Sequence, residues 1–262
     1  MKHWMKRAFL VAAPMLLTGC LWGPGKFNSQ LTIKKDASFV LDYRGELVLQ
    51  LPPDSQPEPW KASMAHCSND DGEDRTCTAA EVAEQKKDHD ESAAKKLKES
   101  EDMAKAFGLP GLDDASNRAF AAKLMKYAGW RSVTYRGKGV FDVDYHMEGR
   151  ATQDFLFPAL PDNDLIIPFI AIRRRTDGTV LVSAPAFTGA AGPLGARAGS
   201  AAVEASKSGP ISRAQGRFSV TTDGEILTNN SEEGATSVAA GRQLHWDVGP
   251  ASNKIPETLI RL

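Results

Sequence analysis

The sequence predicts an α+β protein that consists mainly of antiparallel β-sheet or β-sandwich, with a helical insertion after the first hairpin. Short runs of alternating apolar and polar residues recur along the chain, and tight-turn residues separate them. A stretch rich in Ala, Lys and Glu interrupts these runs, and strands and helices do not alternate regularly. The 262 residues, 42% hydrophobic and 25% charged, are typical of one globular domain of generous size.

Residues 26–51 carry the clearest strand pattern. Phe27, Leu31 and Ile33 alternate with polar residues, and a second alternating run follows the turn at residues 35–38. Period-two patterning of this kind predicts a long antiparallel hairpin with one face in the core and the other in water.

Residues 52–128 predict a helical insertion. Four prolines between positions 52 and 59 break the strand pattern. Thr78-Ala79-Ala80-Glu81 forms a capping box, which predicts a helix from there to about Ala106. A second helix is expected to begin near Asp113 or Asp114, to end near Gly129 and to bury three side chains, Phe120, Leu124 and Tyr127.

Further strands follow the insertion. Turn residues at 137–139, 176–179 and 223–224 separate apolar runs and predict three more hairpins. Residues 186–215 are rich in Gly, Ala and Ser and predict a flexible loop or weak helix. The hairpins cover residues 130–136 with 140–147, 166–175 with 180–183, and 218–222 with 225–228, and two strands, 242–248 and 255–262, close the chain.

The N-terminus has the features of an export signal. Basic residues precede a ten-residue apolar run, Ala8 to Leu17, which is shorter than the roughly 20 residues needed to span a bilayer. The run ends in Leu17-Thr18-Gly19-Cys20, which resembles the lipobox of bacterial lipoprotein precursors. The resemblance implies that residues 1–19 are a signal peptide, that cleavage falls between Gly19 and Cys20, and that the Cys20 thiol carries the lipid.

The resemblance also implies a place in the cell envelope. Residue 21 is Leu rather than the Asp that commonly retains lipoproteins at the inner membrane, so we expect an outer-membrane location facing the periplasm. Residues 20–25 are expected to form a lipidated tether to a single β-rich domain, residues 26–262. Within the tether, Trp22 suits either the headgroup layer or packing on the domain.

Cys67 and Cys77 remain after Cys20 is assigned to the lipid. A pair of cysteines in an oxidising compartment predicts a disulfide, which would close a loop that lacks apolar residues. Zinc bound with His66 and His89 is a weaker alternative, because the spacing fits no zinc pattern. Calcium at the acidic run 69–74 is also weaker, because the order of ligands differs from that of a calcium loop.

No catalytic motif is recognisable. The sequence contains neither G-x-S-x-G nor H-E-x-x-H, and its histidines lie in dissimilar segments. Asp142, Asp144 and His146 share one strand face but extend over about 13 Å, which favours a solvated face over a metal site. We therefore expect no cofactor, no metal and no enzyme activity. The alternative is a hydrolase-type enzyme that uses an unrecognised His and carboxylate pocket.

Charge excludes some partners. The net charge of −1 becomes more negative when the basic residues of the signal are removed, so nucleic acid is not an expected partner. The one dense basic run, Arg173-Arg174-Arg175, fits a strand end in water or a contact with anionic lipid headgroups.

Two segments resemble a known group of proteins. Residues 25–31, 35–36 and 39–46 resemble the N-terminal hairpin of proteobacterial envelope lipoproteins. Residues 222–229 and 244–246 resemble the closing part of LppM-type lipoproteins. The resemblance implies a β-rich, partly helical envelope domain associated with lipid or glycolipid binding. The expected function is that of a non-enzymatic lipoprotein that binds a lipid or a protein partner close to the membrane.

Overall fold

The computed structural model describes residues 22–49, 58–69, 71–106, 110–111, 113–161, 168–188 and 214–262. The chain divides into two compact units, of which one comprises Met1–Leu51 with Asp113–Leu262 and the other comprises Pro52–Leu112. The predicted signal peptide, the Gly19–Cys20 cleavage site and most of the predicted 186–215 loop lie outside the described residues.

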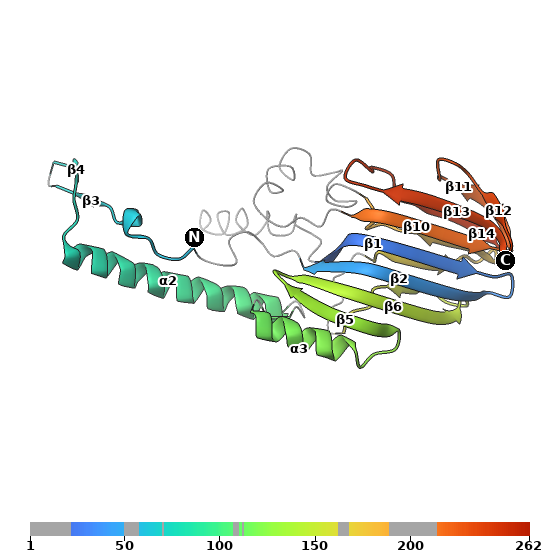
Figure 1. The fold of residues 1–262 in the computed structure, drawn as a ribbon, viewed down its shortest axis with the longest axis horizontal. Helices are drawn as coiled ribbons and strands as arrows, with labels where there is room; N and C mark the ends of the chain where they lie inside the picture. Colours follow the sequence, from blue (N-terminus) through green and yellow to red (C-terminus); the bar gives the residue numbers. More distant parts are fainter. Residues whose placement is uncertain are drawn as a thin grey trace, which may run out of the picture. The chain divides into compact units, whose positions relative to one another are not determined.

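The larger unit contains a seven-stranded sheet, shown in blue, green and orange in Figure 1. β1 lies at its centre and pairs in parallel with β10, whereas all other neighbours in this sheet are antiparallel. The strands, in spatial order, are β12 (Thr236–Val238), β13 (Gly241–Val248), β10 (Gln215–Thr222), β1 (Trp22–Ile33), β2 (Ser38–Leu49), β6 (Val140–Arg150) and β5 (Trp130–Gly137).

A second, five-stranded sheet is antiparallel throughout. It consists, in spatial order, of β11 (Glu225–Asn229), β14 (Glu257–Arg261), β9 (Thr179–Ser183), β8 (Ile170–Arg174) and β7 (Phe155–Phe157). The mainly antiparallel α+β class predicted from the sequence is therefore confirmed, and so are the hairpins β1–β2, β5–β6 and β8–β9.

Aromatic side chains join the two sheets into a sandwich. The ring centres of Phe27 and Phe187 are 4.1 Å apart, and those of Tyr43 and Phe157 are 5.0 Å apart. All four of these side chains are buried, and burial raises the pKa of the Tyr43 hydroxyl well above its usual value. Rings at this spacing fill the interior between the sheets.

Helix α3 (Asp114–Leu124) belongs to the sandwich rather than to the insertion. Asp113 caps it by accepting a hydrogen bond from the Ser116 amide, and Phe120 packs on the Trp22 ring at 5.4 Å. The predicted insertion, 52–128, therefore ends too late, because α3 uses its apolar side chains to cover the sandwich. Tyr127 is 47% exposed, contrary to the prediction, since the helix has ended before it.

The predicted tether is also partly wrong. β1 begins at Trp22, and its first residues pair with Leu47–Leu49 of β2. A register shift between Pro24 and Phe27 accommodates the proline within the strand. Trp22 is 1% exposed, so its ring packs in the domain. Residues 22–25 are thus part of the sheet, and the domain begins at least four residues earlier than position 26.

The predicted fourth hairpin, 218–228, does not form. β10 lies in the seven-stranded sheet and β11 in the five-stranded sheet, where β11 pairs with β14. The Asp223-Gly224 turn therefore carries the chain from one sheet to the other, at a point where Gly224 lies against the Arg261 main chain.

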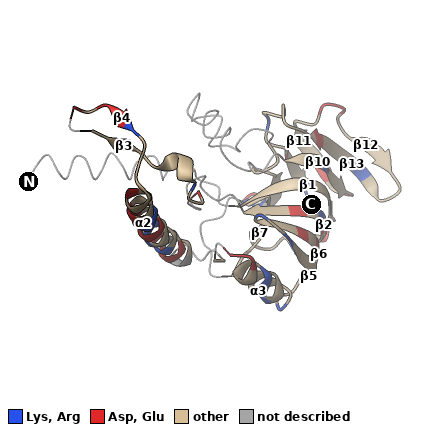
Figure 2. Ribbon diagram, turned by 60° about the vertical axis from the view of Figure 1, so that its left-hand side comes forward, with Lys and Arg blue, Asp and Glu red and all other residues tan. Residues whose placement is uncertain are grey.

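The smaller unit contains helix α2 (Ala79–Ala106), a 3₁₀ turn (Ala62–Met64) and the short strands β3 (Cys67–Ser68) and β4 (Asp74–Arg75). The capping box is confirmed, because the Thr78 amide donates to Glu81 Oε2 at 2.8 Å and the Glu81 amide donates to Thr78 Oγ1 at 3.3 Å. Figure 2 shows that α2 carries both acidic and basic residues along its length. No helix in the described part of the chain is long and apolar enough to cross a membrane.

Candidate functional site

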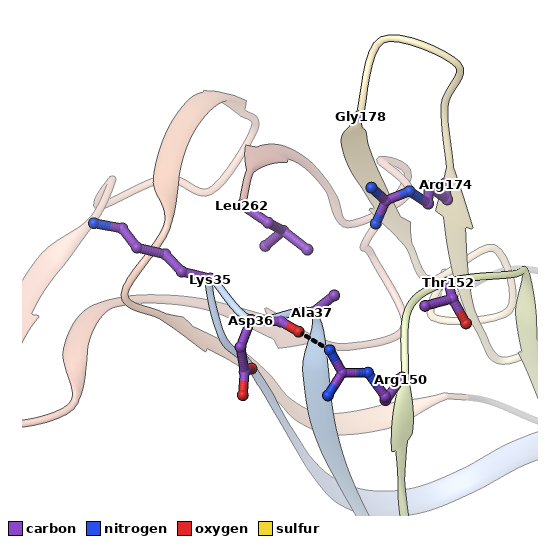
Figure 3. A pocket seen from close by; sticks show the side chains of 8 residues that line it. All are labelled: Lys35, Asp36, Ala37, Arg150, Thr152, Arg174, Gly178 and Leu262. Carbon is purple, nitrogen blue, oxygen red and sulfur yellow. Dashed lines mark hydrogen bonds between the residues drawn. The ribbon is translucent and has the colours of Figure 1, made fainter.

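A pocket of about 510 Å³ opens at one end of the sandwich (Figure 3). Four segments that are far apart in the sequence contribute to it: the β1–β2 turn, the end of β6, the β8–β9 turn and the residue after β14. The lining residues are Lys35, Asp36, Ala37, Arg150, Thr152, Arg174, Gly178 and Leu262.

Local hydrogen bonds shape the β1–β2 turn. Ala37 adopts a positive φ of 65°, and its amide donates to the Lys34 carbonyl at 2.8 Å. The Asp36 carboxylate accepts hydrogen bonds from the amide and the hydroxyl of Ser38. These two bonds are the main reason that the pKa of Asp36 is lowered, and the charge of Arg150 adds to the effect. Asp36 is therefore a fixed carboxylate that helps to close the turn.

Arg150 and Arg174 are the main cationic groups of the pocket. Arg150 Nη2 donates to the Asp36 carbonyl oxygen at 2.5 Å, and Arg174 Nη1 donates to the Ala151 carbonyl oxygen at 3.3 Å. Each guanidinium has five N–H donors, so these contacts fix its position and leave most of its donors free.

Neither guanidinium is paired with a carboxylate of the described residues within 4.0 Å. Arg131, Arg173, Arg175 and Arg242 likewise have no such pair among the described residues, whereas six other arginines do: Arg44, Arg75, Arg118, Arg136, Arg217 and Arg261. The pocket therefore contains positive charge that the described part of the molecule does not neutralise directly.

The remaining side chains set the character of the pocket. In Figure 3, the guanidinium groups of Arg150 and Arg174 project toward the space beside Ala37 and Leu262. The Lys35 ammonium and the Asp36 carboxylate point away from that space. The result is a polar, cationic pocket with a small apolar surface beside the two arginines.

A second pocket, of about 630 Å³, lies near the opposite end of β1. Two of its carboxylates already have an ion pair, because Arg136 Nε donates to Asp142 Oδ2 at 2.5 Å and Arg118 Nη2 lies 3.5 Å from Asp114 Oδ2. We therefore regard it as the weaker candidate. Its lining residues are Glu46, Asp114, Arg136, Gly137, Lys138, Val140 and Asp142.

The strand residues Asp142, Asp144 and His146 do not form one cluster. Each has its own partner, as Asp142 pairs with Arg136, Asp144 pairs with Arg44, and His146 Nδ1 lies 2.7 Å from Asp42 Oδ1. The hydrogen bond with Asp42 raises the pKa of His146, and Glu148 adds to the effect. Neither of the two pockets described above is lined by His146.

The predicted cysteine pair is joined in the smaller unit, where the Cα atoms of Cys67 and Cys77 are 5.3 Å apart. Asn69 orders the loop between them by accepting hydrogen bonds from the amides of Asp71 and Glu73. No group of three potential metal-binding side chains gathers within the described ranges.

The sequence pointed to Arg173–Arg175 as a basic run, but it gave no sign that Arg150 belongs with it. The reason is topological, because β2 pairs with β6 so that Ser38 lies opposite Arg150. This register brings the end of β6 beside the β1–β2 turn, and the facing sheet then supplies Arg174.

Comparisons with known proteins give little further information. No protein family matches the chain, and no curated protein sequence is similar to it. Among solved structures, the NMR structure of the folded domain of the Mycobacterium tuberculosis LppM protein is 12% identical, with 93% of this chain and 91% of that chain covered. The TM-score is 0.25, so this likeness supports no conclusion about function.

Proposed function

We propose that this protein is a lipid-anchored lipoprotein of the bacterial envelope that works by binding rather than by catalysis, with the Arg150–Arg174 pocket as its binding site. The observation that carries the binding site is the convergence of two guanidinium groups, from opposite sheets, in one open pocket without a carboxylate partner among the described residues.

The sequence before the sandwich supports the anchor. Cys20, the expected lipid attachment point, lies two positions before Trp22 in the sequence. Because Trp22 is already a buried residue of β1, almost no linker remains between the lipid and the folded domain. An anchor of two or more acyl chains would hold the domain stably at a membrane.

The direction of β1 supports a ligand beyond the membrane surface. β1 runs from Trp22 next to the anchor to Ile33, and Lys35 of the pocket follows at once. Twelve strand residues span about 40 Å. The pocket is therefore about a strand length away from the expected anchor, so it is not confined to the headgroups next to Cys20.

The filled interior favours this role over that of a lipid carrier. A carrier needs a cavity for acyl chains between the sheets, but Phe27, Tyr43, Phe157 and Phe187 occupy that space. The alternative hydrolase would need His245 or His146 with a carboxylate in a pocket. His245 lies 3.3 Å from Glu233 and His146 lies 2.7 Å from Asp42, but neither histidine lines either described pocket.

The anchor is tested in cells that express the full-length chain. We expect a lipid-modified Cys20 at the N-terminus of the mature protein by mass spectrometry, and membrane association that survives an alkaline wash. Replacement of Cys20→Ser should abolish both, whereas Cys67→Ser with Cys77→Ser should leave both intact. An unmodified Cys20 in the membrane-bound protein would contradict the proposed anchor.

A further inference from the structure

We infer that the Arg150–Arg174 pocket recognises a doubly charged oxyanion, and specifically a phosphate monoester. This inference depends on the proposed function only in taking the pocket as a binding site, and it does not require the lipid anchor. It concerns the chemical class of the ligand, which the net charge and the motifs of the sequence do not indicate.

Each of the two exposed arginines is restrained by one hydrogen bond to a main-chain carbonyl before a ligand arrives. Arg150 is fixed by the Asp36 carbonyl and Arg174 by the Ala151 carbonyl. Those two carbonyls belong to adjacent chain segments, because the Ala151 amide itself donates to the Ala37 carbonyl at 2.7 Å. A preorganised pair of guanidinium groups loses less conformational entropy on binding than mobile side chains do.

The count of charges favours a dianion. The side chains that line the pocket carry three positive charges, on Lys35, Arg150 and Arg174, and one negative charge, on Asp36, which sum to +2. The Asp36 carboxylate accepts from Ser38, and the Asp154 carboxylate accepts from the Arg174 amide at 3.2 Å. A phosphate monoester carries a charge of about −1.5 to −2 at neutral pH and offers three oxygens, so it can bridge two guanidinium forks. A monocarboxylate can neutralise only one of them.

The rest of the pocket fits the other parts of an ester. Thr152 lines the pocket and carries a hydroxyl that can donate to an oxygen. The side chains of Ala37 and Leu262 supply an apolar surface beside the arginines, against which the organic part of the ester can pack (Figure 3). At about 510 Å³, the space is larger than a phosphate ion alone needs.

The test is calorimetric titration of the full-length protein, purified in detergent, with inorganic phosphate, glycerol phosphate and acetate at equal ionic strength. We expect saturable binding of one glycerol phosphate per chain, at least about tenfold tighter than acetate. Binding should strengthen between pH 5 and pH 7.5, because a phosphate monoester gains its second charge near pH 6. Equal binding of acetate and glycerol phosphate would overturn the inference.

Variants locate the site. Arg150→Gln and Arg174→Gln are each expected to weaken glycerol phosphate binding by about tenfold, since each removes a charged donor. Arg174→Lys keeps the charge but not the fork, so we expect an intermediate loss. Arg217→Gln is the matched control, because it removes the same charge from a residue that pairs with Asp247 and does not line the pocket. An equal loss in the control would show non-specific attraction and overturn the assignment.

The source of the phosphate is settled by a further titration with a short-chain, water-soluble phosphatidic acid. Binding tighter than that of glycerol phosphate would identify a lipid headgroup as the ligand, whereas equal binding would identify a soluble ester. If the protein bound neither glycerol phosphate nor the phosphatidic acid, the inference would be overturned. Because none of these titrations requires a membrane, a Cys20→Ser chain should bind glycerol phosphate as the unchanged chain does, and a failed anchor test would leave this inference standing.

Discussion

The sequence left two roles open for Trp22, namely a place in the headgroup layer of the membrane or packing on the domain. Its ring is 1% exposed and lies 5.4 Å from that of Phe120 and 5.6 Å from that of Phe141. Residues 21–25 precede the first alternating strand pattern, at Lys26, which predicted a tether. The pairing with β2, which the local sequence does not show, decides the matter.

Replacement of Trp22→Ala is expected to destabilise the sandwich by about 3–5 kcal/mol, because it leaves a large cavity between β1 and α3. Urea unfolding followed by circular dichroism measures the change. Trp60→Ala, in the smaller unit, is the control and should leave the unfolding of the sandwich unchanged. A loss below about 1 kcal/mol for Trp22→Ala would mean that its ring is not a core residue.

His146 should make the stability of the sandwich depend on pH. Asp42 and Glu148 raise its pKa in the folded protein, and Arg131 opposes them. A raised folded pKa means that the stabilisation is fully present below the unfolded value of 6.5 and is lost as pH rises through the folded value. Because the His146–Asp42 pair is near the surface, we expect it to stabilise the folded state by about 0.2–1 kcal/mol at low pH.

The measurement compares urea unfolding of the wild type and His146→Gln at about pH 5 and about pH 9. At the lower pH the variant should have a smaller free energy of unfolding than the wild type. At the higher pH the two free energies of unfolding should be closer together. A difference that is the same at both pH values would show that the imidazolium charge contributes nothing.

Among the elements, the sequence predicts best those whose signals are local. The β1–β2 hairpin follows from alternation, and α2 follows from the capping box formed by Thr78 and Glu81. The predicted hairpin at 218–228 is wrong because a tight turn can join two strands of one sheet or carry the chain between two sheets. Only the partners of β10 and β11, far along the chain, distinguish these outcomes.

The pairing of β1 with β10 depends on a glycine. Gly216 lies opposite Phe27, and a Cβ atom at this position would collide with the Phe27 carbonyl. Gly216→Ala is therefore expected to destabilise the sandwich by about 1–3 kcal/mol, as measured by thermal or urea unfolding. Ser219→Ala, in the same strand, is the control and should have a smaller effect. Equal effects of the two substitutions would argue against the close approach.

At the scale of the whole molecule, the chain has two compact units where the sequence suggested a single domain. Composition did mark the start of the smaller unit at Pro52, but its end at Leu112 depends on the packing of α3, which local patterns do not reveal. Local patterns do not predict the candidate pocket either, because its four segments meet only through strand register and the stacking of two sheets. The basic run at 173–175 and the turns at 35–38 and 176–179 were predicted from the sequence, but nothing local showed that they meet.

The division into units predicts that the smaller one is dispensable for the fold of the larger. Glu46 and Asp114 line the same pocket, so β2 and the start of α3 are close in space. Replacing residues 52–112 with a short Gly/Ser linker should leave the sandwich folded, with its β-sheet circular dichroism and cooperative unfolding retained. Loss of cooperative unfolding in this variant would show that the smaller unit completes the core of the larger one.

The central position of β1 also bears on when the chain can fold. The first strand of the domain acquires one of its two neighbours only when β10, almost 190 residues later, is available. Pairing at such sequence separation raises the contact order and postpones closure of the larger sheet until most of the chain has emerged. A polypeptide that must cross a membrane before it folds would benefit from this delay, since an early, stable N-terminal half would obstruct passage. The order of strands in the sheet is thus compatible with secretion in an unfolded state.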